Sequence, residues 1–265
     1  MRHLVTVALL TLLAAPTGQA VAADKVDLQL ILAADVSRSV DPDEFHLQRE
    51  GYASAFTDPK VLNAIQSGPN HAIAVTFVEW SGSEAQHVVA AWTVIRDEET
   101  ASDFVATLRT AQRSFAGFTS ISAAIDFSMK LFETSGVESD RRMIDVSGDG
   151  TNNGGRPVND ARDEAVAQGV TINGLAIINQ HPNPGYTAHT QPPEGLGEYY
   201  RQNVTGGPGS FVIVIEDFTT FGEAIVNKLV TEIANTGRKR PVAEYRGFKA
   251  VEERSRSSPR ARVAG

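Results

Sequence analysis

The hydrophobic pattern of the chain alternates between strand-like and helix-like segments. Apolar runs typical of buried strands occupy residues 28–34, 72–80, 86–94, 143–147, 170–178 and 211–215. Apolar residues recur at helical spacing over 42–56, 97–113, 120–133, 157–168 and 218–234. This alternation predicts an α/β fold: a doubly wound, mostly parallel sheet with helices on both faces.

Local signals refine this prediction. The link Ser81–Ser83 is too short for a helical crossover, so the strands on either side should form a hairpin with one antiparallel strand at the sheet edge. Asp41 and Pro42 are suited to cap and start the first helix. Between Asn179 and Gly209 a long excursion with five prolines interrupts the pattern, and loops of this length are usually functional or disordered.

The two ends of the chain differ from its centre. Residues 1–22 combine a basic start, an apolar core over 4–15 and a small-residue cleavage site at 20–22, which predicts a signal peptide and a periplasmic or secreted protein. An uncleaved anchor is the alternative, but the apolar core is short for a membrane span. Residues 24–237 should form one domain, with no membrane span in the mature chain. Residues 238–265 form a basic tail that we expect to be disordered.

Charge and cysteine content narrow the chemistry. The tail carries nine Lys and Arg against three Glu, so the rest of the chain is more acidic than the formal net charge of −8 suggests. An acidic domain attracts cations and disfavours nucleic acid as a partner. The chain contains no cysteine, which excludes thiolate metal ligands, a cysteine nucleophile and disulfides.

Polar residues with oxygen donors stand at the ends of the predicted strands. Asp35, Ser37 and Ser39 follow the first strand, and alternate side chains of an extended segment share one side. Thr119 lies in the sequence Gly-Phe-Thr-Ser before a helix, and Asp149 lies in Ser-Gly-Asp-Gly after another strand. In a doubly wound sheet these positions fall on the carboxyl edge. Such a group of oxygen atoms suits a hard divalent cation.

The three motifs, in this order, resemble the metal-ion-dependent adhesion site (MIDAS) of von Willebrand factor type A (vWA) domains. The resemblance extends over about residues 26–234. The run Leu47–Tyr52 and the Gly-Gly-Pro-Gly loop at 206–209 look like a bacterial exported subfamily of unknown function. The third motif departs from the family, which commonly has Thr-Asp-Gly where this chain has Ser-Gly-Asp-Gly.

The resemblance implies a metal site with five positions: Asp35, Ser37, Ser39, Thr119 and Asp149. It implies that hydroxyls ligate directly, that the acids often act through water, and that Mg²⁺ is held, with Mn²⁺ or Ca²⁺ as alternatives. It also implies that one coordination position is left for an acidic residue of a protein partner. The predicted function is therefore a non-enzymatic, metal-dependent protein-binding module.

Other interpretations are open from the sequence. Asp35, Ser37 and Thr119 could cap the helices that follow them, and the glycines around Asp149 could form an ordinary turn. A metal-dependent hydrolase is the alternative function, but it needs a general base, and no histidine lies in the three motifs. A scaffold with a vestigial site is a third possibility.

Three residues outside the motifs also carry expectations. His181 and His189 lie in the proline-rich excursion and are expected to be solvated, with a zinc-binding role as the less favoured alternative. Asp145 lies inside an apolar strand, where an unpaired carboxylate is costly. It could pair with a neighbouring arginine or line the acidic edge behind the metal ligands, and we favour the structural pairing.

Overall fold

A six-stranded sheet forms the centre of the computed structural model, which describes residues 23–178, 185, 187–216 and 220–234. Its strands are β2 (Gln29–Asp35), β3 (Ile73–Trp80), β4 (Gln86–Ile95), β6 (Arg142–Gly148), β7 (Val170–Ile177) and β8 (Val212–Ile215). They lie in the order β4-β3-β2-β6-β7-β8, and each neighbouring pair is parallel except β3 and β4. The predicted hairpin with an antiparallel edge strand is confirmed. A separate small sheet pairs β1 (Asp24–Lys25) with β5 (Val137–Glu138).

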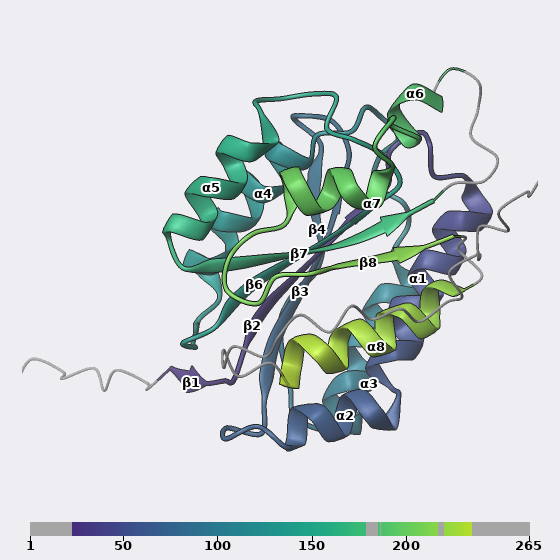
Figure 1. Ribbon diagram of the computed structural model, residues 1–265. Helices are drawn as coiled ribbons and strands as arrows, with labels where there is room; N and C mark the ends of the chain where they lie inside the picture. The colour runs from purple at the N-terminus through teal and green to yellow at the C-terminus, as the bar shows by residue number, and fades with distance from the viewer. Residues whose placement is uncertain (1–22, 179–184, 186, 217–219, 235–265) are drawn as a thin grey trace, which may run out of the picture.

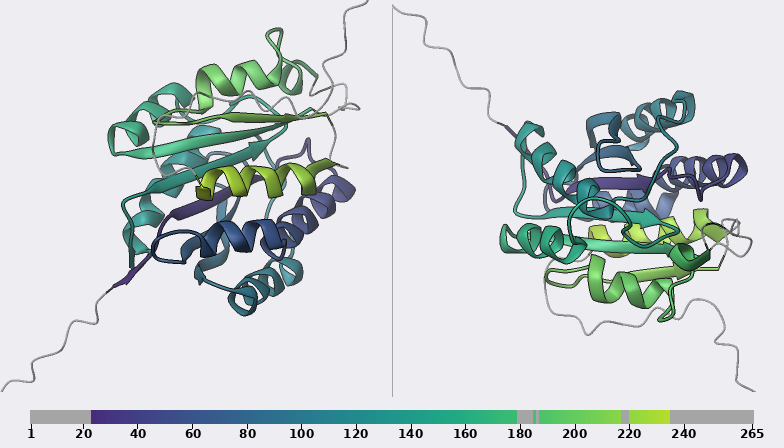
Figure 2. Two further views of the ribbon diagram at one scale, coloured as in Figure 1. Left: turned by 60° about the horizontal axis from the view of Figure 1, so that its bottom comes forward. Right: turned by 90° about the horizontal axis from the view of Figure 1, so that it is seen from above.

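Helices cover both faces of the sheet (Figure 1). One face carries α1 (Pro42–Phe56), α2 (Pro59–Gln66), α3 (Glu98–Thr110) and α8 (Phe221–Ala234). The other face carries α4 (Ile121–Leu131), α5 (Val158–Ala167), α7 (Leu196–Tyr199) and the π-helical turn η2 (Tyr200–Val204). The 3₁₀ turn η1 (Phe132–Thr134) follows α4, and the short helix α6 (Thr187–Thr190) lies in the excursion after β7. Figure 2 shows the sheet between these two helical layers.

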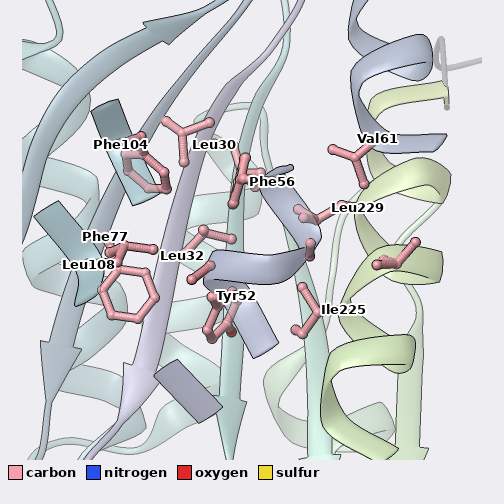
Figure 3. Packing of buried hydrophobic residues seen from close by; sticks show 14 of the residues in the cluster. Leu30, Leu32, Tyr52, Phe56, Val61, Phe77, Phe104, Leu108, Ile225 and Leu229 are labelled. Carbon is pink, nitrogen blue, oxygen red and sulfur yellow. The ribbon is translucent and has the colours of Figure 1, made fainter. Parts of the chain in front are cut away.

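The central strands β2, β3, β6 and β7 are largely apolar, as expected where helices bury both faces of a sheet. Along β2, Leu30 and Leu32 pack with α1, α2, α3 and α8, whereas Ile31 and Ala33 pack with α4 and α5. On the α1 side, the Tyr52 ring meets the Phe77 ring edge to face, with a centroid distance of 5.1 Å (Figure 3). This packing holds α1, and therefore the loop before it, firmly against the sheet.

The strand order reverses at β2. The chain leaves β2 toward β3 on one side of it and later returns to β6 on the other side. Doubly wound sheets bind ligands in the crevice at the carboxyl ends of the strands where this reversal occurs. The predicted doubly wound architecture is confirmed, and it places the residues after β2 and β6 next to one another.

Several element boundaries differ from the sequence prediction. The helix expected over 97–113 ends at Thr110, and Arg113 instead bonds to a loop described below. A second helix, α2, follows α1 because Asp58 caps it and Pro59 starts it; the sequence analysis did not predict this element. The predictions for residues 1–22, 218–219 and 238–265 and for His181 lie outside the described residues. No helix in the described part of the chain is long and apolar enough to cross a membrane.

Candidate metal centre

The loop between β2 and α1 carries the first three candidate residues. The Ser37 backbone N–H donates to Asp35 Oδ1 at 2.7 Å, and Ser37 Oγ lies 3.0 Å from Ser39 Oγ. Asp35 and Ser37 are buried, and Ser39 is half-buried. Helix α1 is capped by Asp41 in a capping box with Glu44, so Asp35 and Ser37 do not cap it.

Arg113 fixes the shape of this loop. Its Nη2 donates to the carbonyl oxygens of Val36 and Ser37, both at 2.7 Å, and of Val40 at 2.9 Å. From the other side, Gln48 Nε2 donates to the Asp35 carbonyl at 3.1 Å. Helical spacing over 97–113 predicted Arg113 at the end of a helix, so its contacts with this loop were not expected from the sequence.

Asp149 joins this loop from the end of β6. Ser39 Oγ donates to Asp149 Oδ1 at 2.6 Å, so the first and third motifs are in direct contact. The backbone of Gly148 packs closely beside this contact: a Cβ atom on Gly148 would lie 2.7 Å from Tyr200 Oη and 3.0 Å from Asp35 Oδ2. The glycine by which this motif departs from the usual vWA pattern thus makes room for Asp35 and for Tyr200, a residue that the sequence analysis did not identify.

Thr119 is held by the segment that follows Asp149. The Thr119 N–H donates to Asn153 Oδ1 at 2.9 Å, and the Asn153 N–H donates to the Thr119 carbonyl at 2.8 Å. Helix α4 is capped by Ser120, whose Oγ accepts from the Ala123 N–H, so Thr119 does not cap it. The structure therefore brings Asp35, Ser37, Ser39 and Asp149 together directly, and Thr119 faces the residues immediately after Asp149.

His189, on α6, is part of this edge rather than a solvated residue. Its Nε2 lies 2.9 Å from Thr119 Oγ1, and its Nδ1 lies 2.8 Å from Thr151 Oγ1. Burial lowers the pKa of the imidazole. The expectation of a solvated His189 was wrong because α6 folds back over the end of the sheet at which the arrows of β7 and β8 end (Figure 1).

The electrostatics around Asp35 and Asp149 favour a bound cation. Burial, and then repulsion by Asp149, raise the pKa of Asp35 well above its usual range. Within the described residues, the buried Asp35 Oδ2 has no hydrogen-bond partner. A buried carboxylate oxygen in this situation is costly, and a bound divalent cation removes both the desolvation cost and the repulsion.

The spacing of the oxygen atoms also fits a small cation. Neighbouring ligands of an octahedral ion with bonds of about 2.1 Å are about 3.0 Å apart, which is the separation of Ser37 Oγ and Ser39 Oγ. Over the ranges that the structure describes, no three His, Asp or Glu side chains are grouped in a way that would hold a metal ion. The candidate centre therefore depends on hydroxyl oxygens as well as on the two carboxylates.

Asp145 lies outside this centre. It forms a buried ion pair with Lys228 at 2.7 Å, and Lys228 also contacts Glu232 on the same helix. Glu232 Oε1 accepts a further hydrogen bond from Asn173 Nδ2 at 2.8 Å. The predicted structural pairing of Asp145 is confirmed, with a lysine of α8 in place of an arginine.

The fold is that of a vWA domain, as comparison with solved structures shows. Proximal thread matrix protein 1 from the mussel byssus, in a structure with a zinc-occupied MIDAS motif, is 14% identical, with a TM-score of 0.58 over 79% of this chain and 48% of that chain. A von Willebrand factor type A protein from Catenulispora acidiphila is 15% identical, with a TM-score of 0.52 over 82% of this chain and 44% of that chain. The pilus adhesin SpaC from Lactobacillus rhamnosus GG is 14% identical, with a TM-score of 0.54 over 81% and 31%. This chain thus spans about half the length of the mussel protein and less than half the length of the other two proteins.

The family follows from the sequence match. Residues 25–237 match the family described as "Protein of unknown function (DUF1194)", and the chain belongs to that family. No curated protein sequence matches the chain. The resemblance to vWA domains inferred from the three motifs is confirmed at the level of the fold.

Proposed function

We propose that this protein is a metal-dependent protein-binding module that presents a divalent cation to a carboxylate of a partner protein. The observation that carries the proposal is the contact between Ser39 and Asp149 beside the buried Asp35 carboxylate. It joins two motifs that are far apart in sequence at the point of the sheet where ligands bind. In the mussel protein, which has the same fold, the MIDAS motif is occupied by zinc.

The roles of the residues follow from their chemistry. Ser37, Ser39 and Thr119 would supply neutral oxygen ligands, and Asp35 and Asp149 would supply charge and orient water. Such a donor set suits Mg²⁺, or Mn²⁺ in its place, whereas Ca²⁺ requires a larger shell. When bound, the cation supplies positive charge at the sheet edge, and a partner carboxylate that replaces a water would make a specific, metal-dependent contact.

A metal-dependent hydrolase is the second candidate, and one observation bears on it. His189 places an imidazole at the centre, which the three motifs lacked. Both of its ring nitrogens are engaged, however, with Thr119 and with Thr151. A general base needs a free nitrogen within reach of a water or substrate, so we favour binding over catalysis. Turnover of phosphoester or ester substrates that disappears in Asp149→Ala would favour the hydrolase.

Affinity capture with and without metal tests the binding function. The purified protein is immobilised and exposed to an extract of the producing cells in Mg²⁺ or in EDTA. We expect a partner that is retained in Mg²⁺, released by EDTA and lost with Thr119→Ala. The exposed Thr107 on α3 provides the matched control, Thr107→Ala, which should retain the partner. Equal retention in Mg²⁺ and EDTA would contradict the proposal.

A further inference from the structure

The phenol ring of Tyr200 lies across two strands of the sheet and reaches the candidate metal centre. Tyr200 begins η2, and a Cβ atom on Gly174 of β7 would lie 2.8 Å from Tyr200 Cδ1. A Cβ atom on Gly148, at the carboxyl end of β6, would lie 2.7 Å from Tyr200 Oη. The ring therefore packs on Gly174 and its hydroxyl on Gly148. Glycine in a strand often marks a close approach of this kind, and here two glycines seat one tyrosine.

The Tyr200 hydroxyl and the Asp35 carboxylate are close neighbours. Tyr200 Oη and Asp35 Oδ2 lie 2.7 Å and 3.0 Å from the same point, where a Cβ atom on Gly148 would lie. Both residues are fully buried, and within the described part of the chain neither of these two atoms has a hydrogen-bond partner. The other carboxylate oxygen, Oδ1, accepts from the Ser37 N–H. A buried donor and a buried acceptor without partners are each costly, so a contact between them relieves both costs.

The separation of the two oxygens suits a contact through water. They do not form a direct hydrogen bond, but two atoms within 3.0 Å of one point are close enough for a single water to bridge. A buried water needs at least two polar partners, and this place offers a hydroxyl and a carboxylate. Burial, and then the charge of Asp35, raise the pKa of Tyr200 well above its usual range. The hydroxyl therefore keeps its proton and can donate it.

We propose that Tyr200 is a positioning residue of the metal centre: its hydroxyl donates through one water to Asp35 Oδ2 and fixes the carboxylate. The inference rests on the proposed function and adds to it a residue outside the three motifs. Asp35 is then held at both oxygens, by Ser37 at Oδ1 and by Tyr200 at Oδ2. Donors behind a metal-binding group orient it, and their removal lowers metal affinity about 10–100-fold. The segment between β7 and β8 thus serves the centre by carrying Tyr200 to it.

Calorimetric titration of the purified protein with Mg²⁺ tests this role. Tyr200→Phe removes the hydroxyl and keeps the ring, so we expect the Mg²⁺ affinity to fall about tenfold. Tyr52→Phe is the matched control, because Tyr52 is also fully buried and its hydroxyl donates to Ser147 Oγ at 3.0 Å on the α1 side of the sheet. Tyr52→Phe should lower the melting temperature in EDTA by about 2–4 °C and leave the Mg²⁺ affinity unchanged.

Thermal unfolding in EDTA tests the contact with Asp35 in the absence of the ion. A hydroxyl that is bonded to Asp35 and a hydroxyl without a partner predict opposite effects of Tyr200→Phe. We expect the melting temperature to fall by about 2–4 °C, because a hydrogen bond is lost. The fall should be smaller in an Asp35→Ala background, where no carboxylate is left to accept.

The outcomes separate the role of Tyr200 from the metal centre. With Mg²⁺ bound by the wild type, an unchanged affinity in Tyr200→Phe would overturn the role and keep the centre. A melting temperature of Tyr200→Phe in EDTA that equals or exceeds that of the wild type would also overturn the role, as would an equal fall in the Asp35→Ala background. Equal weakening of Mg²⁺ binding by Tyr200→Phe and Tyr52→Phe would do the same. Absence of Mg²⁺ binding in the wild type would overturn the centre and, with it, the role of Tyr200.

Discussion

Ser39 and Asp149 are joined by a hydrogen bond of 2.6 Å from Ser39 Oγ to Asp149 Oδ1. Ser39 follows β2 and Asp149 follows β6, and these two strands are neighbours in the sheet. The contact is therefore a consequence of the topology: the strand order reverses at β2, and the loops after both strands meet at one edge. Asp35 lies beside this contact with a buried carboxylate, so the same reversal concentrates negative charge there.

Divalent cations should stabilise the protein through this concentration of charge. A ligand at 100 times its dissociation constant stabilises the folded state by about 2.7 kcal/mol, because it binds only that state. We therefore expect millimolar Mg²⁺ to raise the melting temperature relative to EDTA, and Asp149→Ala to remove the response. Asp103→Ala, on an exposed site of α3, should keep it. Identical melting curves of the wild type in Mg²⁺ and EDTA would argue against the bound ion.

Gly148→Ala should damage the candidate metal centre although it removes none of the candidate metal ligands. The added Cβ would lie 2.7 Å from Tyr200 Oη and 3.0 Å from Asp35 Oδ2, so one of these side chains must move. Overpacking of this kind costs about 1–3 kcal/mol of the free energy of unfolding. Denaturant unfolding and Mg²⁺ titration measure both effects. Gly82→Ala is the control, because the nearest atom to its Cβ would be 3.9 Å away. A Gly148→Ala protein with wild-type stability and Mg²⁺ affinity would refute this packing role.

Arg113→Met should loosen the loop that carries Ser37 and Ser39. The substitution leaves the carbonyls of Val36, Ser37 and Val40 without this donor, at a cost of about 1–3 kcal/mol. Hydrogen exchange measured by mass spectrometry should become faster for peptides that cover residues 36–40, and Mg²⁺ affinity should fall. Arg109→Met removes only a surface ion pair with Glu50 and should have little effect. Unchanged exchange over residues 36–40 in Arg113→Met would contradict this role.

The buried ion network of α8 should make stability depend on pH. Burial raises the pKa of Glu232 to about 7, although Lys228 opposes the shift. The folded state then retains a proton that the unfolded state has released, so this contribution is full below pH 4.5 and is lost as the pH rises through 7.

Urea unfolding between pH 5 and pH 8 measures this loss, which we expect to be on the order of 3 kcal/mol. Glu232→Gln should flatten the profile, because the amide cannot ionise. Glu223→Gln, at an exposed position of the same helix, should leave the profile unchanged. A wild-type profile that stays flat over this range would show that Glu232 does not titrate there.

The sequence was sufficient for the six strands of the central sheet, but not for the short strands β1 and β5. That the five candidate residues hold a metal ion stays a prediction. Buried parallel strands are recognisable as short apolar runs, and the motifs stand at their carboxyl ends, which a doubly wound topology brings to one edge. The residues that support the site were not predictable in this way. Arg113 and His189 act across loops, where no periodicity indicates which side chains will meet. The two asparagines at 152 and 153, shortly after the third motif, were the available signal: Asn153 accepts from the Thr119 N–H and Asn152 accepts from the Ser122 N–H.

Anomalous diffraction from crystals soaked in Mn²⁺ tests the central claim most directly, because it locates the ion without assuming its ligands. The account predicts one strong anomalous peak at the carboxyl edge of the sheet, within bonding distance of Ser37 Oγ and Ser39 Oγ and close to Asp149. The peak should be absent from crystals of Asp149→Ala. The absence of a peak at this edge in the wild type at millimolar Mn²⁺, or a peak only at another place on the protein, would contradict the account.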